Sequence, residues 1–375
     1  MSGGPGFAVD TWQWVRLGGR LQFIRVLAAR EGLPVLLVLH GGPGFPNGRD
    51  FLRRHAALAR HFTILAWDQR GAGLSALTAG SARLTLDGLV EDAAELVSAA
   101  RRRVPGAPLF VLGLSWGSEL GIALVRTHPE GIAAYVGSGQ AVAGVAGEQL
   151  SYRAAVAGAD AAARDRRRDP RARRRARRDL AILRLVGPPR GSRYRPLLLG
   201  LAVQRRLLAR YTGTAGPRDA EMGARTADIP APIAPAPVSA APASAEPASS
   251  TPVPRPVSLL ERAATRVGIV RSLAQLWPTA TGYDFRTEAA RLAVPVHFLQ
   301  GRHDRTTPSA LVAEYAAVLG APAVDLVWFE HSGHSPARNE PERFERVLIE
   351  QLLRTPQSEP QPREPQQPAP PEAGR

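Results

Sequence analysis

Short apolar runs alternate with amphipathic stretches along two parts of the chain. The apolar runs are rich in Val, Ile and Leu, which is typical of strands buried on both faces of a parallel sheet. Between them, apolar residues recur every three to four positions, which predicts helices. The predicted strands are 12–17, 21–27, 34–39, 62–67, 109–112, 132–136, 296–299 and 324–329. This alternation predicts an α/β fold with a mostly parallel sheet and helices on both faces.

The alternation stops for about 140 residues and then resumes. We therefore predict one core from residues 1–140 and 285–354, interrupted by a largely helical cap or lid at 141–284. The insertion follows the carboxyl end of a strand, where the active sites of such sheets lie. Its segment 229–257 is dominated by Pro, Ala and Ser and is predicted to be flexible. The tail 355–375, rich in Pro, Gln and Glu, is predicted to be disordered.

The charge of the chain is large and concentrated. The net charge is +15, and all 48 basic residues are Arg. Ten of these lie between Arg164 and Arg178, where no aromatic residue interleaves to form a stacking platform for single-stranded nucleic acid. We interpret this run as a solvated helix face and expect no nucleic-acid partner; a docking surface for an anionic partner is the alternative.

Several classes of protein are disfavoured by what the sequence lacks. There is no Cys, so neither a disulfide nor a thiolate metal site is expected. No spacing of His, Asp and Glu indicates a metal site. The apolar runs 33–39 and 197–203 are too short to span a bilayer, and the first thirty residues lack a secretory pattern. We predict a cytoplasmic protein without membrane association, metal or cofactor.

The strand 109–112 runs into Gly113-Leu114-Ser115-Trp116-Gly117, which is followed by a predicted helix. A G-x-S-x-G sequence between a strand and a helix is the pattern of a nucleophile elbow. The glycines accommodate a strained turn that lifts the Ser hydroxyl to the positive end of the helix. The pattern predicts Ser115 as a nucleophile; a turn without function is the alternative if no base and acid accompany it.

A Ser hydroxyl is a weak nucleophile at neutral pH and needs a base, which in turn needs an acid to orient it. In enzymes with this elbow, the order along the chain is Ser, acid, His. Asp304 follows the strand 296–299, and His334 follows the strand 324–329. We therefore predict that Ser115, Asp304 and His334 form a catalytic triad at one edge of the sheet.

Other acidic and His side chains fit these roles less well. The loop after strand 132–136 carries no carboxylate, Asp325 lies within a strand, and Asp68 precedes the elbow. His331 is still close to the end of its strand. We interpret His331 as a partly buried packing residue beside the base.

A Gly-rich loop, His40-Gly41-Gly42-Pro43-Gly44, follows the strand 34–39. An oxyanion needs two backbone N–H donors. Because Pro43 has no N–H, we predict the amides of Trp116 and Gly42, with Gly41 as the next candidate. His40 is interpreted as orienting this loop, which Gly41 and Gly44 support. The alternative of a phosphate-binding loop is disfavoured, because the P-loop Lys and the G-x-G-x-x-G spacing are both absent.

Together these motifs resemble the α/β-hydrolase superfamily and, within it, the proline iminopeptidase group. The resemblance rests on the Gly-rich loop, the stretch 68–75, the elbow, Gly301-x-x-Asp304 and Gly333-His334-Ser335. It implies the α/β-hydrolase fold with a helical cap, and an oxyanion loop, nucleophile, acid and base at the residues already named. Asp68 and Arg70 are expected to pair within a structural turn.

The resemblance also implies a serine hydrolase that forms an acyl-enzyme and releases N-terminal residues, often Pro, from small or short-peptide substrates. Such an aminopeptidase must hold an ammonium group, and in that group of enzymes acidic cap residues contribute. Here the insertion is Arg-rich, and Glu148, Glu221 and Glu261 are among its few carboxylates. Hydrolysis of a carboxylic ester or related acyl compound is therefore an alternative. A non-catalytic protein that binds anions or nucleic acid through its Arg run is a third.

Overall fold

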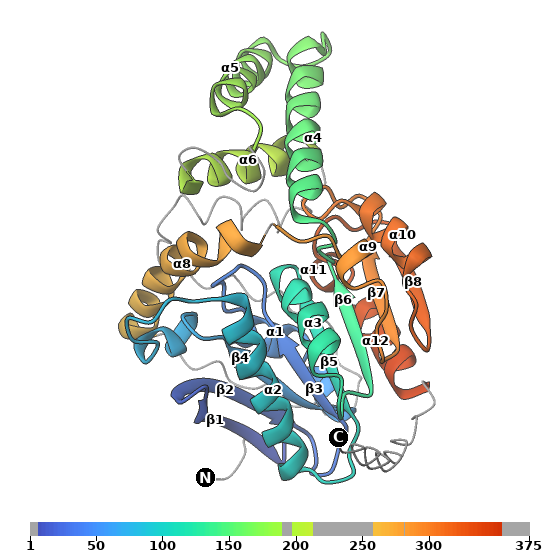
Figure 1. Ribbon diagram of the computed structural model, residues 1–375. Helices are drawn as coiled ribbons and strands as arrows, with labels where there is room; N and C mark the ends of the chain where they lie inside the picture. The colour runs from blue at the N-terminus through green and yellow to red at the C-terminus, as the bar shows by residue number, and fades with distance from the viewer. Residues whose placement is uncertain (1–6, 190–196, 213–257, 281, 355–375) are drawn as a thin grey trace, which may run out of the picture.

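The structure is a computed structural model of the chain (Figure 1), and it describes residues 7–189, 197–212, 258–280 and 282–354. The loop predicted at 229–257 and the tail predicted at 355–375 lie outside the described residues.

An eight-stranded sheet forms the centre of the described part, in the order β1-β2-β4-β3-β5-β6-β7-β8. β1 pairs with β2 and β2 with β4 antiparallel, and the other neighbours are parallel. The prediction of a mostly parallel sheet is confirmed. The strands are β1 Val9–Leu17, β2 Arg20–Ala28, β3 Val35–Leu39, β4 Thr63–Asp68, β5 Leu109–Leu114, β6 Ala134–Ser138, β7 Val296–Gly301 and β8 Val324–Phe329.

Burial follows the position of each strand in the sheet. Every residue of β3, β4, β6 and β7 is buried, whereas β1 and β8 at the two edges are largely half-buried or exposed. β6 begins two residues later than predicted, because the Ile132 amide donates to the Pro129 carbonyl (3.1 Å) in the preceding turn.

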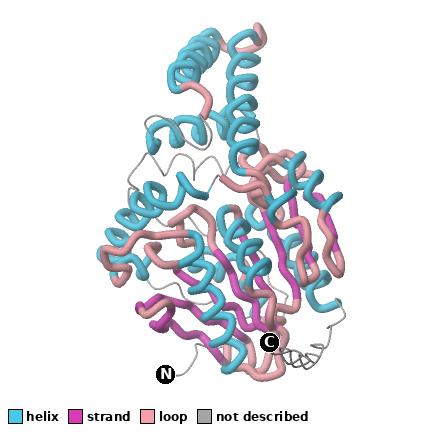
Figure 2. Tube along the Cα trace, in the orientation of Figure 1, coloured by secondary structure: helices cyan, strands magenta, loops and turns pink. Residues whose placement is uncertain are grey.

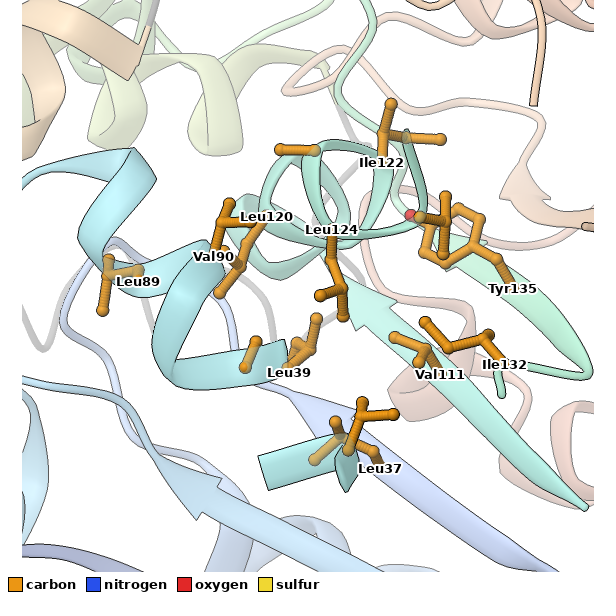
Figure 3. Packing of buried hydrophobic residues seen from close by; sticks show 14 of the residues in the cluster. Leu37, Leu39, Leu89, Val90, Val111, Leu120, Ile122, Leu124, Ile132 and Tyr135 are labelled. Carbon is orange, nitrogen blue, oxygen red and sulfur yellow. The ribbon is translucent and has the colours of Figure 1, made fainter. Parts of the chain in front are cut away.

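Helices cover both faces of the sheet, as predicted (Figure 2). The core helices are α1 Gly48–Arg54, α2 Leu86–Arg103, α3 Trp116–Thr127, α9 Phe285–Glu288, α10 Ser309–Val318, α11 Pro336–Asn339 and α12 Pro341–Arg354. On one face of the sheet, α2 and α3 bury Val90, Leu120 and Leu124 above Leu39 and Val111 of the strands (Figure 3). The opposite face is covered by α1, the 3-10 turn Ala56–Arg60 and α12. A second 3-10 turn spans Gly73–Leu77.

The segment between β6 and α9 is helical where the structure describes it. Its helices are α4 Gly144–Arg164, α5 Pro170–Val186, α6 Leu197–Thr212 and α8 Leu259–Ala280. In Figure 1, α4, α5 and α6 stand away from the sheet, whereas α8 lies close to it. The segment leaves and re-enters the core at one place, because Ala143 bridges Asp284 and the Phe285 amide donates to the Val142 carbonyl (2.9 Å). We refer to residues 144–280 as the cap.

The Arg-rich run forms the end of α4, a short loop and the first turns of α5. Ala176 and Leu180 of α5 face inward, whereas Arg171, Arg174 and Arg178 are exposed. The apolar side of α5 is therefore used in packing against α4 and α6, and its Arg side faces solvent. No helix within the described ranges is long and apolar enough to cross a bilayer.

Candidate active site

Ser115 lies in the sharp turn between β5 and α3, at φ +54° and ψ −118°. Among the described residues other than Gly, it alone has a positive φ, and such strain at a non-Gly residue is characteristic of functional sites. A Cβ atom on Gly117 would overlap the carbonyl oxygen of Leu39, and one on Gly113 would lie 2.6 Å from the carbonyl oxygen of Gly117. The two elbow glycines are therefore required by close backbone approach.

The structure brings the three residues predicted to form the triad together. Oγ of Ser115 lies 2.8 Å from Nε2 of His334, and Nδ1 of His334 lies 3.0 Å from Oδ2 of Asp304. Asp304 is fully buried and follows β7, whereas His334 is slightly exposed and follows β8. Because a carboxylate only accepts hydrogen bonds, Nδ1 of His334 carries a proton and Nε2 accepts from the Ser115 hydroxyl.

Asp304 is held by an unusually complete set of donors. Its Oδ1 accepts from the amides of Thr306 (2.8 Å) and Thr307 (3.0 Å). Its Oδ2 accepts from His334, from Oγ1 of Thr307 (2.6 Å) and from Nε2 of Gln300 (3.0 Å). Burial alone would raise the pKa of Asp304, but the charge of His334 and the hydrogen bonds from His334 and Thr307 outweigh it and lower that pKa. The carboxyl is therefore kept ionised.

Thr307 and Gln300 were not identified from the sequence. Oγ1 of Thr307 also lies 3.2 Å from Nδ1 of His334, so this hydroxyl contacts both Asp304 and His334. Gln300 is fully buried at the end of β7, and its Oε1 accepts from the amide of Gln140 (3.0 Å). The turn Asp304-x-x-Thr307 is a local signal that would have identified Thr307. Gln300 has no such signal, because its role depends on the neighbouring strand β6.

The Gly-rich loop passes directly beside Ser115. A Cβ atom on Gly41 would lie 3.4 Å from Cβ and 3.9 Å from Oγ of Ser115. Gly42 has φ +137°, a conformation that L side chains rarely adopt, and a Cβ there would overlap the amide of Gly44. The amide of Trp116 opens α3 and has no intrahelical acceptor. The loop and this helix end therefore border the same reacting position, as an oxyanion site requires.

Gly44 joins this loop to the cap. It has φ +84°, and a Cβ atom there would lie 2.6 Å from Cβ of Ser272 on α8. The close contact means that α8 rests directly on the Gly-rich loop. A change in the position of α8 would therefore be transmitted to the loop that borders Ser115.

His40 is occupied by the backbone of its own turn. Its Nδ1 donates to the Gly41 carbonyl (2.8 Å), and its Nε2 accepts from the Gln69 amide (3.2 Å). Complete burial lowers the pKa of His40, which keeps the ring neutral in this arrangement. Gln69 completes the support, since its side chain donates to the His40 carbonyl (3.0 Å) and accepts from Nε1 of Trp116 (3.1 Å). His40 thus orients the loop, and Gln69 links it to the start of α3.

The expected pairing of Asp68 with Arg70 is wrong. Asp68 pairs with Arg25 at 2.6 Å, and both side chains are almost fully buried. In the antiparallel register, Asp68 lies opposite Phe23 of β2. Arg25 lies two residues after Phe23 on the same face of β2, which places it diagonally across from Asp68. Arg70 lies beyond the end of β4 and instead donates from Nε to Asp92 of α2 (2.8 Å).

The interpretation of His331 as a partly buried packing residue is also wrong. His331 is exposed, and its backbone amide donates to Glu340 (3.2 Å). It lies in the turn directly after β8, which directs its ring to solvent, whereas His334 turns back toward the sheet edge.

Among the described residues, no group of three or more His, Cys, Asp or Glu side chains could hold a metal ion.

A family model for the alpha/beta hydrolase fold matches residues 34–337. The chain therefore belongs to the α/β-hydrolase family, which confirms the predicted fold class.

Similar proteins carry the names that the sequence motifs suggested. A probable aminopeptidase, YbaC of Bacillus subtilis (strain 168), is 29% identical over 127 residues, which are 34% of this chain and 40% of that protein. A proline iminopeptidase of Heyndrickxia coagulans is 34% identical over 115 residues, 31% of this chain and 38% of the other. The chain thus matches about two fifths of the length of these relatives. These partial matches confirm the resemblance to the proline iminopeptidase group.

The fold is also found in enzymes that are not named as aminopeptidases. The structure of an esterase, RhEst1 from Rhodococcus sp. ECU1013, superposes with a TM-score of 0.51 at 16% identity. The superposition covers 92% of this chain and 99% of the esterase. At this identity the likeness shows the fold alone.

Proposed function

We propose that the chain is a serine hydrolase acting through Ser115, His334 and Asp304. The observation that carries the proposal is the 2.8 Å contact between Oγ of Ser115 and Nε2 of His334 at a strained strand-to-helix turn. A nucleophile within hydrogen-bond reach of a base, itself oriented by a buried acid, is the arrangement that acyl transfer needs.

In the proposed reaction, Oγ of Ser115 forms a bond to the substrate carbonyl carbon while Nε2 of His334 takes the hydroxyl proton. The amides of Trp116 and Gly42 stabilise the oxygen that becomes negative. The carbonyl re-forms as the bond to the leaving group breaks, and His334 returns the proton to that group. Water then attacks the acyl-enzyme with His334 again as base, which releases the acid and regenerates Ser115.

For the substrate, we propose an aminoacyl amide or short peptide from which the N-terminal residue is released. The names of the two relatives, a probable aminopeptidase and a proline iminopeptidase, support this choice. An ester or related acyl hydrolase is the second candidate. The exposed Arg side of α5 favours it, because that field disfavours a cationic substrate.

A paired assay separates the two candidates. Hydrolysis of a prolyl-arylamide and of a short-chain aryl ester is measured with the wild type, with Ser115→Ala and with Ser98→Ala, an exposed Ser on α2 that serves as the matched control. We expect turnover of the prolyl-arylamide that is lost in Ser115→Ala and retained in Ser98→Ala. Turnover of the ester without any of the prolyl-arylamide would rule out the aminopeptidase.

A further inference from the structure

A buried carboxyl group lies on the nucleophile helix, one turn after Ser115. Glu119 of α3 is only 3% exposed. Within the described residues its Oε1 has no hydrogen-bond partner, and no Arg forms an ion pair with it. Burying an acidic side chain without a cation is costly, so an unpaired buried carboxyl is a candidate ligand-binding group.

The direction of α3 places this carboxyl toward the reaction site. In a helix, Cα–Cβ bonds tilt toward the N-terminus, and residues four apart lie on one face with Cβ atoms about 5–6 Å apart. The N-terminus of α3 is the elbow itself. The side chain of Glu119 therefore leans toward the end of the helix that carries Ser115.

The residues that face Glu119 come from the point where the cap joins the core. The side chain of Tyr283 lies close enough to the Glu119 carboxyl for each group to influence the ionisation of the other. The carbonyl of Tyr283 accepts from the amide of Gly144 at the start of α4 (3.1 Å), and its ring stacks on Phe285 with centroids 4.4 Å apart. Tyr283 is thus fixed by the joint between cap and core and cannot itself neutralise a carboxylate.

A second acidic side chain lies on the cap side of Tyr283. Glu148 of α4 is 5% exposed and lies close enough to Tyr283, as Tyr135 of β6 also does, to influence its ionisation. Glu148 is paired with Arg205 of α6, and Gln204 beside it donates to the Glu148 carbonyl (3.5 Å). Arg205 is therefore already paired with Glu148, and no Arg among the described residues forms an ion pair with Glu119.

We infer that Glu119 binds the protonated amino group of the substrate. The inference rests on the proposed function and names its ligand class, an α-amino acyl compound with a free amino terminus. In such a compound the amino nitrogen is two bonds from the carbonyl carbon that Ser115 attacks. It must therefore lie within about one helical turn, roughly 5 Å, of the nucleophile.

This position reconciles an Arg-rich cap with a cationic substrate. The carboxyl comes from the core helix α3, whereas the exposed arginines lie on α5 of the cap. Burial raises the pKa of Glu119 well above its ordinary value, an effect that the neighbouring Tyr283 only partly offsets. An arriving ammonium group would favour the ionised carboxylate, so binding should release a proton.

Calorimetric titration tests this in proteins that carry Ser115→Ala, so that the probes are not hydrolysed during the measurement. The probes are prolinamide, which carries the ammonium group, and cyclopentanecarboxamide, its uncharged isostere. We expect Ser115→Ala to bind prolinamide at least 10-fold more tightly than the isostere. Adding Glu119→Gln should abolish that preference and leave binding of the isostere unchanged, whereas adding Glu130→Gln, the same change at an exposed position, should keep the preference.

Three results would overturn the inference: no preference in Ser115→Ala, a preference retained when Glu119→Gln is added, or no proton release with prolinamide when two buffers of different ionisation enthalpy are compared. The last measurement uses only Ser115→Ala and so does not depend on the folding of a Glu119 variant. Selective prolinamide binding without hydrolysis of prolyl-arylamide would support this inference and refute the proposed function. Hydrolysis of prolyl-arylamide, together with an unchanged preference for prolinamide in the Glu119→Gln variant, would support the proposed function and refute this inference.

Discussion

His334 and Ser115 are 219 positions apart in the chain, yet Nε2 of one lies 2.8 Å from Oγ of the other. The contact joins the loop after β8, at one edge of the sheet, to the elbow after β5. Because both residues lie at the carboxyl ends of parallel strands, the sheet itself fixes their separation. The sheet therefore holds the proposed nucleophile and the proposed base in alignment.

Thr307 is predicted to position the acid and the base. Thr307→Val removes the hydroxyl that lies 2.6 Å from Asp304 and 3.2 Å from His334 while keeping the volume of the side chain. Loss of a hydrogen bond to a charged group should lower kcat about 10-fold, with KM unchanged. Steady-state kinetics check this, and Thr307→Ser should restore most of kcat. Wild-type kcat in Thr307→Val would contradict the role.

Asp304 is predicted to make stability depend on acid pH. Its pKa is lowered in the folded protein, so ionised Asp304 contributes stability above its unfolded pKa, near 4, and that contribution is lost as the pH falls through the folded value. The free energy of unfolding in urea should therefore fall more steeply between pH 6 and pH 3 for the wild type than for Asp304→Asn. Parallel curves for the two proteins would be inconsistent with a lowered pKa.

Gly42 is predicted to be required by its conformation. Gly42→Ala must strain a backbone at φ +137° and displace the amide of Gly44, so the predicted oxyanion donor moves. Loss of one such donor should lower kcat about 100- to 1,000-fold. Gly19→Ala is the matched control, because Gly19 has φ +71° in a hairpin with nothing close to its Cβ position. It should cost about 1 kcal/mol of stability and no activity. Full kcat in Gly42→Ala would exclude that amide.

Arg25 and Asp68 are predicted to stabilise the sheet only as a pair. Arg25→Met leaves the carboxylate of Asp68 buried without its partner and should lower the free energy of unfolding by about 3–5 kcal/mol. Arg53→Met breaks a partly exposed pair with Asp50 and should cost less than about 1 kcal/mol. Urea denaturation measures both, and adding Asp68→Asn to Arg25→Met should recover part of the loss. Equal losses in the two single variants would contradict this account.

The sequence predicted the features whose signal is local. The elbow around Ser115 is recognised from a strand, two glycines and a helix that are contiguous in the sequence. Asp304 and His334 are recognised because they follow Ser115 in the order that this architecture requires. What it missed depends on distant elements. The partner of Asp68 depends on the register of β2 against β4, the role of Gln300 on its neighbour β6, and the burial of Glu119 on how the cap rejoins the core. No spacing within one segment carries that information.

The central claim is that His334 activates Ser115, and the rate and site of fluorophosphonate labelling test it most directly. Peptide mass mapping of the labelled wild type should place the adduct on Ser115. Ser115→Ala should not label, and His334→Ala should label at least 100-fold more slowly, since a general base typically contributes about 100- to 10,000-fold. Labelling of Ser115→Ala at the wild-type rate, or an unchanged rate in His334→Ala, would contradict the account.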